Sequence, residues 1–451
     1  RKGLVRCIVC TSTLAQGVNL PIRYLIITSL YQAQDKIKVR DFHNLMGRAG
    51  RAGLYTEGTV LFSESFVYSR KYMRRFNWRW REYLSMLDPS NAESCLSQLL
   101  LLVRPKIFKM SQEILKYDFY ELALIRYTSS SDEQYNIYVA TAIFDFKEKC
   151  KKYPKIIGVF QSAIHIINIS LDVIESYLLS FLADENVQDF DLLVSRTFGY
   201  FLSNEVEKER MSKLFNVIKD YLLETVATAE KRRVFSRTLL DVRILIELEK
   251  WVTVNASIII GLKTTSDILK LIMPQLVKYS KNKCMMSVVI EDELFVIANM
   301  WIEGKSYKQI FEYTIERNVK IIRRNKEAEI TLGEIIDICD EGFGYTATLV
   351  INAISDLLQF KYEESKDACK LITELSKQMR YGLPTKKSIV IYESGFADRV
   401  ISLRMAAQLD DTNIDNKKQF KEAIRNKKSS LMETLSEFPT IFSNRLSETK
   451  Y

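Results

Sequence analysis

Apolar residues recur at every third or fourth position over long stretches of the chain from about residue 70 onward. That spacing places their side chains on one face of a helix. It predicts helices over residues 163–183, 205–228, 233–253, 266–279, 292–303, 345–360, 365–380 and 396–409. Because the chain has only seven prolines, few of these stretches are interrupted. Gly304 is expected to end one helix, and Ser306 with Gln309 to begin the next as a capping box.

The first 68 residues have a different pattern, in which short apolar runs are separated by turns. Six of the 15 glycines lie in the first 58 residues. Runs rich in β-branched residues predict strands at 5–10, 24–28 and 58–62, with helical segments at 14–17 and 39–46 between them. Strands that alternate with helices indicate an α/β domain with a parallel sheet.

The composition is that of a soluble globular protein, with 47% hydrophobic and 27% charged residues. The longest uncharged stretch, 156–171, is broken by polar residues and is too short to predict a membrane span. No secretory signal opens the chain. Seven cysteines do not make a disulfide scaffold, and reduced thiols fit a cytoplasmic protein that does not contact membranes.

Cys7 and Cys10 form a single C-x-x-C pair on the predicted strand 5–10. A zinc site would need further ligands at suitable spacing, and the chain has no second pair and only two histidines. We therefore favour two small residues on a buried strand, and predict no metal site.

The net charge of +9 is concentrated in one part of the chain. Residues 1–110 hold 18 Lys+Arg and 7 Asp+Glu, whereas the other 341 residues hold 47 and 49. A basic surface near the start of the chain is therefore expected, which suits a polyanionic partner.

Two glycine-containing segments hold the candidate chemistry. Residues 11–21, Thr-Ser-Thr-Leu-Ala-Gln-Gly-Val-Asn-Leu-Pro, follow a predicted strand directly, and hydroxyls at the end of such a strand suit phosphate oxygens. Residues 44–53, Asn-Leu-Met-Gly-Arg-Ala-Gly-Arg-Ala-Gly, place Arg48 and Arg51 three positions apart among glycines. Arginine offers several planar donors to phosphate, and glycine allows close approach of the backbone.

In this order, the two segments resemble motifs V and VI of superfamily 2 helicases, in the Ski-like branch of the DEAD/DEAH type. The resemblance is firm over residues 3–62 and loose beyond them. It implies a second RecA-like helicase domain at 1–68, with a parallel sheet that is incomplete at its N-terminus. A linker with a winged-helix region would follow at 69–150, and a helical domain, ratchet-like or partner-binding, at 151–451.

The resemblance assigns roles position by position. Arg48 and Arg51 match the paired arginines of motif VI, and Arg51 matches the arginine finger that stabilises charge on the ATP γ-phosphate. The positions implied to contact nucleotide or couple it to nucleic acid are Gly17, Asn19, Asn44 and Gly47. Those implied to lie near the nucleic-acid backbone are Thr11 and Ser12. Asn44 departs from the family, which usually has Gln there, so its contact is expected to be weaker.

The chain contains no G-x-x-x-x-G-K-[ST] loop and no D-E-x-H box. In the family these belong to the first RecA-like domain, which holds most of the contacts to ATP and Mg²⁺. The chain is therefore expected to be the C-terminal part of a longer motor and to be inactive alone. A motor that binds without turning over, and solvated arginine turns with no site, remain as alternatives.

Residues 70–81 interleave six basic residues with Tyr72, Phe76, Trp78 and Trp80. The mixture suits phosphate contact with base stacking, and the candidates are Arg74, Arg75, Trp78 and Arg79. It equally suits a helix that packs its aromatic rings and leaves arginine in solvent.

Several further alternatives stay open from the sequence. Residues 29–39 are either a β-hairpin, as relatives use to part strands, or a plain loop. Arg399 and Arg404, five positions apart on a predicted helix, either meet phosphates or, as we favour, have structural roles. The leading function is an ATP-dependent helicase or translocase on DNA or RNA. The alternative is a non-catalytic module that recruits a partner such as a nuclease, since the C-terminal region faintly resembles helicases of bacterial antiviral defence operons.

Overall fold

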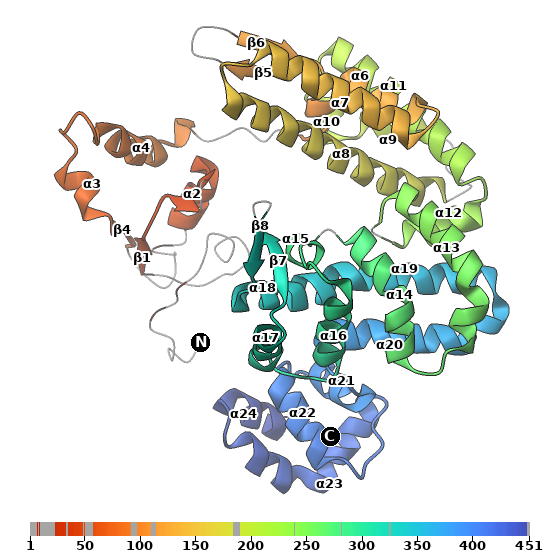
Figure 1. The fold of residues 1–451 in the computed structure, drawn as a ribbon. Coiled ribbons are helices and arrows are strands. Elements are labelled where there is room, and N and C mark those ends of the chain that lie inside the picture. Colours follow the sequence, from red (N-terminus) through yellow and green to blue (C-terminus); the bar gives the residue numbers. More distant parts are fainter. Residues whose placement is uncertain are drawn as a thin grey trace. The chain divides into compact units, whose positions relative to one another are not determined.

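The computed structural model describes residues 7, 9, 23–32, 35–47, 49, 57–91, 97–109, 114–183, 190–238, 240–280, 282–323 and 326–448. They fall into two compact units, residues 1–97 and 98–451, which are described separately (Figure 1). The predicted linker and winged-helix region, 69–150, contributes residues to both units.

The described part of the first unit contains short strands and three α-helices. The elements are β1 (Tyr24–Ile27), β2 (Tyr31–Gln32), β3 (Asp35–Lys36), α2 (Val39–Met46), β4 (Thr59–Phe62), α3 (Ser65–Ser69), α4 (Asn77–Leu87) and the 3₁₀ turn η1 (Pro89–Asn91). β1 and β4 pair in parallel, and α2 spans 39–46, as predicted. β2 and β3 pair antiparallel, so the described residues of 29–39 agree with the predicted hairpin and not with the plain loop.

The prediction of a buried strand at 5–10 is wrong for the two residues of it that the structure describes. Cys7 is exposed, Val9 is 96% exposed, and neither lies in a strand. A strand needs a hydrogen-bonded neighbour, and the only partner of β1 among the described residues is β4. Cys10 and the segment 14–17 lie outside the described residues.

The second unit is helical, with two antiparallel hairpins. The hairpins are β5 (Lys106–Lys109) with β6 (Ile114–Tyr117), and β7 (Lys320–Arg323) with β8 (Lys326–Glu329). The helices up to the second hairpin are α5 (Leu100–Val103), α6 (Tyr120–Thr128), α7 (Asp132–Lys149), α8 (Pro154–Leu182), α9 (Phe190–Ser195), α10 (Phe198–Phe201), α11 (Glu205–Thr225), α12 (Ala229–Ser236), α13 (Val242–Gly261), α14 (Thr265–Tyr279), α15 (Lys283–Met286), α16 (Glu291–Ile302) and α17 (Tyr307–Glu316). After it come α18 (Leu332–Asp337), the π-helix η2 (Ile338–Ala347), α19 (Thr348–Lys361), the 3₁₀ turn η3 (Glu363–Ser365), α20 (Lys366–Tyr381), α21 (Lys386–Glu393), α22 (Arg399–Gln408), α23 (Lys417–Leu435) and α24 (Thr440–Glu448).

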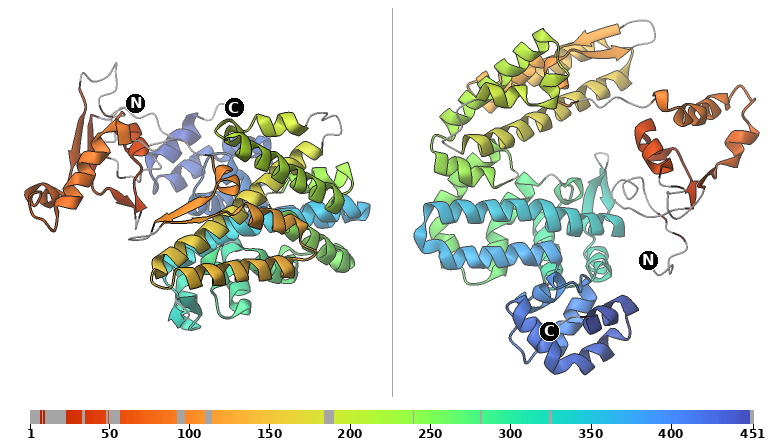
Figure 2. Two further views of the ribbon diagram at one scale, coloured as in Figure 1. Left: turned by 90° about the horizontal axis from the view of Figure 1, so that it is seen from above. Right: turned by 180° about the vertical axis from the view of Figure 1, so that it is seen from behind.

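The helical predictions are largely confirmed. Gly304 follows α16 with a positive φ of 83°, and Ser306 and Gln309 form the capping box of α17. The predicted helix 233–253 is instead two helices, because the Asp241 side chain accepts from the Arg243 N–H and starts α13 afresh. α19 and α20 lie side by side in the views of Figures 1 and 2.

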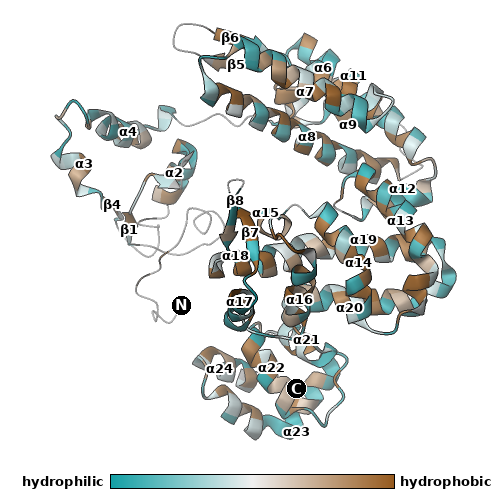
Figure 3. Cartoon of the chain, in the orientation of Figure 1, coloured by the Kyte–Doolittle hydropathy of each residue, from teal (hydrophilic) through white to brown (hydrophobic). Residues whose placement is uncertain are grey.

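α8 is the most apolar long helix of the second unit (Figure 3). Among the described residues it alone is long and apolar enough to cross a bilayer, judged by length and composition. One face of α8 is buried in the main core, through residues such as Phe160, Ile167 and Leu171. Glu175 lies on that buried side and is fully buried.

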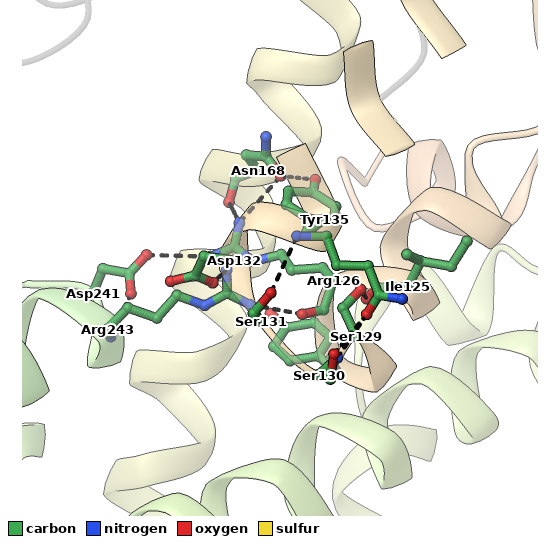
Figure 4. Close-up of polar contacts among 12 residues, drawn as sticks. Ile125, Arg126, Ser129, Ser130, Ser131, Asp132, Tyr135, Asn168, Asp241 and Arg243 are labelled. Atoms are coloured by element: carbon green, nitrogen blue, oxygen red, sulfur yellow. Dashed lines mark hydrogen bonds and ion pairs between the residues drawn. The ribbon is translucent and has the colours of Figure 1, made fainter. Parts of the chain in front are cut away.

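A buried ionic cluster holds four helices together around Arg126 of α6 (Figure 4). Arg126 donates to the Asn168 carbonyl at 3.2 Å, to the Asp241 carboxylate at 3.1 Å and to Glu175 at 3.3 Å, and it also pairs with Asp172. Arg243 of α13 donates to the Arg126 carbonyl at 2.6 Å. Since these groups come from α6, α8 and α13, and Tyr135 of α7 donates to Asn168 at 2.7 Å, the cluster fixes the helices at one place.

Burial sets the protonation behaviour of this cluster. Desolvation, with a smaller contribution from the charge of Asp241, raises the pKa of the Glu175 carboxyl to about 7. Desolvation also raises the pKa of Asp172. Tyr127 donates to Glu175 at 2.6 Å, so one Glu175 oxygen has a second partner.

The last four helices, α21 to α24, have a hydrophobic core of their own. Arg399 of α22 joins this bundle to the rest of the unit: its guanidinium carbon lies 3.7 Å from the Trp301 ring centroid, and it donates to the Gly382 and Lys305 carbonyls, each at 3.0 Å. Gly382 has φ of +60°, and an added Cβ would lie 2.6 Å from Trp301. Arg404 pairs with Glu437. The structural interpretation is therefore confirmed for Arg399, whereas for Arg404, which is exposed, it stays a prediction.

We expect Arg126→Ala to lower the free energy of unfolding of the second unit by about 3–5 kcal/mol, because it leaves buried carboxylates without their cation. Chemical denaturation followed by far-UV circular dichroism measures the loss. Arg196→Ala, which removes an exposed arginine from the same unit, is the control and should change the value by less than about 0.5 kcal/mol. Equal losses in both variants would contradict the role of the cluster.

The raised pKa of Glu175 also predicts a pH dependence. The folded chain binds this proton more tightly than the unfolded chain, whose carboxyl has an ordinary value of 4.5. The contribution to stability is therefore complete below about pH 4.5 and is lost as the pH rises through about 7. Denaturation curves between these pH values should show falling stability, and Glu175→Gln should flatten the trend. An unchanged slope in that variant would show that another group titrates.

Candidate nucleic-acid interface of the first unit

The helix α2 holds the described part of the predicted motif VI. Phe42 is fully buried and stacks on Phe62 of β4, with ring centroids 5.8 Å apart, so the orientation of α2 is fixed. Asn44 lies on the other side and is exposed. Gly47 ends the helix, its N–H donating to the His43 carbonyl at 2.9 Å, and it is exposed as well.

Thr11, Ser12, Gly17, Asn19, Arg48 and Arg51 lie outside the described residues. Asn44 and Gly47 therefore mark where motif VI leaves α2, and the roles of all eight residues stay predictions. In the part of the chain that the structure describes, no group of three or more His, Cys, Asp or Glu could hold a metal ion.

Side chains of α4 and of the turn before it line an open concavity of about 690 Å³. Its walls combine aromatic, basic and polar groups: Tyr72, Arg74, Asn77, Trp78, Arg81, Glu82 and Ser85. Tyr72 is 88% exposed and Trp78 55% exposed. Exposed rings beside arginines offer a surface on which a base can stack while its phosphate is neutralised.

Glu82, which lines the concavity, also connects α4 to other elements of the first unit. It accepts a hydrogen bond from the Tyr31 hydroxyl at 2.6 Å and lies 4.0 Å from the Lys36 ammonium. The hydrogen bond to Glu82, with burial, raises the pKa of Tyr31 to about 12, so this hydroxyl stays a donor at neutral pH. Because Tyr31 and Lys36 belong to β2 and β3, Glu82 ties that hairpin to α4.

Arg79 has an internal partner on the opposite side of α4. It forms an ion pair with Glu64 at 2.9 Å, and its guanidinium lies 5.1 Å from the Phe66 ring centroid. Tyr83 donates to the same carboxylate, and burial, with that hydrogen bond, raises its pKa. Arg79 therefore holds α3 and α4 together.

The structure brings together two of the four predicted contacts on this segment, Arg74 and Trp78, in the concavity. Arg75 is exposed beside it and does not line it. Tyr72 and Arg81 line it and were missed as candidates. The helical period would have found Arg81, since positions 77, 78, 81, 82 and 85 of α4 share one face, and the same period places Arg79 on another.

Comparison with known proteins links the chain to helicases. No family model matches it. It is 23% identical over 432 residues to the Hachiman protein HamB of Bacillus cereus, covering 90% of this chain and 34% of that protein. Shorter matches are 46% identical over 66 residues to Helicase POLQ-like of Drosophila melanogaster, and 35% over 82 residues to the ATP-dependent DNA helicase Hel308 of Pyrobaculum calidifontis.

These matches cover different shares of the chain. The two helicase matches include 14% and 17% of it, and 6% and 12% of the helicases themselves. The chain spans about a third of the length of HamB. By these matches the chain is similar to helicases over short segments and to HamB over most of its length.

Proposed function

We propose that the chain is part of an ATP-dependent nucleic-acid helicase or translocase of the Ski-like branch. In this proposal residues 1–68 are the second RecA-like domain, 69–150 include a winged-helix region and 151–451 form the helical domain. The β5–β6 hairpin, together with the helices α5, α6 and α7, supports the assignment of a winged-helix region within 69–150. The proposed substrate is DNA or RNA, and the proposed location is the cytoplasm.

The observation that carries the proposal is the packing of α2 on α4. Phe62 stacks on Phe42 of α2 and meets Tyr83 of α4 edge-on, with centroids 4.8 Å apart. The helix that leads into motif VI is thereby joined through three rings to the helix that lines the basic, aromatic concavity. A displacement of one helix moves the other, because packed interiors shift as units.

The mechanism follows from this arrangement. ATP with Mg²⁺, held mainly by another motor domain, would supply the phosphoanhydride whose cleavage changes the charge near motif VI. Arg48 and Arg51 would sense that charge, and Asn44, exposed on α2, would offer an amide to the same region. The change would reach bound nucleic acid through α2, Phe62 and α4, and Tyr72 and Trp78 would hold a base by stacking.

A second candidate function is a module that binds nucleic acid without turnover and recruits a partner such as a nuclease, in bacterial antiviral defence. One observation favours it: α8 exposes an apolar row on the side away from the core, at Val159, Ile166, Ile169, Val173 and Tyr177. A contiguous exposed apolar surface is a feature of many protein interfaces. The match to HamB over 90% of the chain fits either function.

Arg51→Ala in the full-length protein should lower nucleic-acid-stimulated ATP hydrolysis by about 10³-fold or more, as for other arginine fingers. Binding of nucleic acid should persist, because the finger acts on phosphate charge in the transition state. A steady-state ATPase assay with DNA and with RNA measures the first, and fluorescence anisotropy the second. Near-normal turnover would remove the finger assignment, and turnover absent from the unmodified protein would favour the non-catalytic module.

Trp78→Ala should weaken binding of a single strand by roughly 5- to 150-fold, since stacking contributes about 1–3 kcal/mol per base. Fluorescence anisotropy with a labelled oligonucleotide gives the affinity. Phe201→Ala, which removes a 78% exposed ring from the second unit, is the matched control and should bind normally. If both variants bind as the unmodified chain does, the concavity is not a nucleic-acid site.

A further inference from the structure

A dense group of lysines lies where α7 ends and α8 begins. The sequence from 147 to 155, Lys-Glu-Lys-Cys-Lys-Lys-Tyr-Pro-Lys, contains five lysines and one acid. All five lysines, here called the lysine turn, are exposed: Lys147, Lys149, Lys151, Lys152 and Lys155. This local excess of positive charge contrasts with the nearly balanced charge of the chain beyond residue 110.

Folding alone accounts for only some of these charges. Lys147 and Lys149 lie in the last turn of α7, where cations are favoured by the helix dipole. Lys151 forms an ion pair with Glu148 at 2.5 Å. Lys152 and Lys155 have no such benefit: Lys155 is the second residue of α8, where a cation faces the positive end of the helix.

The lysine turn is held on a rigid support. Cys150 is fully buried and its N–H donates to the Phe146 carbonyl at 3.0 Å, and the Tyr153 N–H donates to the Cys150 carbonyl at 2.8 Å. Directly beneath, Phe146 and Phe160 stack with centroids 3.8 Å apart and planes within 9°. The lysines therefore extend from a well-packed support that fixes their positions despite their mutual repulsion, as in a preorganised binding surface.

The β5–β6 hairpin extends the basic surface. Phe108 and Tyr117, from its two strands, pack on Phe160 with centroids 5.9 and 4.7 Å away, so the hairpin lies at the same end of α7 and α8 (Figure 1). Lys116 is exposed on its outer face, opposite Ile107. Acids near this surface include Asp118, Asp145 and Glu148, and the six lysines outnumber these three.

We propose that the lysine turn, together with Lys116 of the hairpin, binds the phosphodiester backbone of nucleic acid as a second contact surface, apart from the concavity on α4. Flexible lysine ammonium groups act as point charges that suit backbone phosphate and not base identity, so the contact is independent of sequence. The proposal rests on the proposed function in taking nucleic acid as the polyanion.

The test compares the chain with a variant that carries Lys149→Gln, Lys152→Gln and Lys155→Gln. Fluorescence anisotropy measures binding of a labelled duplex and a labelled single strand from about 50 to 200 mM salt. The variant should bind about tenfold more weakly, and its plot of log affinity against log salt should be shallower by roughly 2 to 3, because each lost phosphate contact removes about 0.9 for a duplex.

Two further variants make the result specific. Lys250→Gln, Lys270→Gln and Lys366→Gln remove the same charge from exposed lysines elsewhere in the second unit and should leave affinity and salt dependence nearly unchanged. Arginine at positions 149, 152 and 155 should restore binding, because the charge returns. Equal effects of the two glutamine variants, or no effect of either, would overturn the proposal.

The outcomes also separate this inference from the proposed function and from another polyanion. If Trp78→Ala weakens binding and the lysine-turn variant does not, the second surface fails and the motor assignment stands. If neither the chain nor its variants bind nucleic acid, both fail. If the lysines are needed for binding phosphatidylserine vesicles and leave nucleic-acid binding unchanged, the surface belongs to a membrane and the proposal is wrong.

Discussion

The burial of Arg126 constrains the packing of α6, α7, α8 and α13 in the helical unit. An arginine inside a protein must have carboxylates and carbonyls placed around it, and here they come from α8 and from the first residue before α13. Displacement of any of these helices would leave a charge without a partner in a medium of low dielectric constant, which is strongly unfavourable. The aromatic stack of Phe146 and Phe160 and the hairpin above it are built on helices whose relative positions this cluster fixes.

In the first unit as well, carboxylates with partners on other elements fix how those elements pack. Glu64 and Glu82 lie on different sides of α4, and each accepts from residues that belong to other elements. Glu64 connects α3 to α4, and Glu82 connects the β2–β3 hairpin to α4. A face of α4 that Glu64 does not contact presents Trp78 and Arg81 to solvent. The exposed rings are therefore the part of the segment that internal packing does not occupy, which is the physical basis for treating them as a binding surface.

The sequence predicted what depends on local pattern and missed what depends on distant partners. The helix at 39–46 was predictable because Val39 and Phe42 already mark its buried face. The two α/β strands and the capping box at Ser306 follow from short-range chemistry as well. The Arg126 cluster was not predictable from local pattern, because the side-chain partners of Arg126 lie 42 to 115 residues further along the chain. Similarly, the helical period puts Arg79 and Arg81 on different faces of α4, but only the packing of that helix shows which of them meets Glu64 and which lines the concavity.

The contact between Arg399 and Trp301 links the fluorescence emission of Trp301 to the docking of the last four helices. Of its four tryptophans, Trp301 is only 2% exposed, its indole N–H donates to the Met379 carbonyl at 2.7 Å, and a guanidinium covers its face. Trp78, by contrast, is mostly in water. An indole in such surroundings emits at shorter wavelength than a solvated one, so the emission of Trp301 reports whether the last four helices remain docked. Detachment of that bundle would be visible as a red shift without any added label.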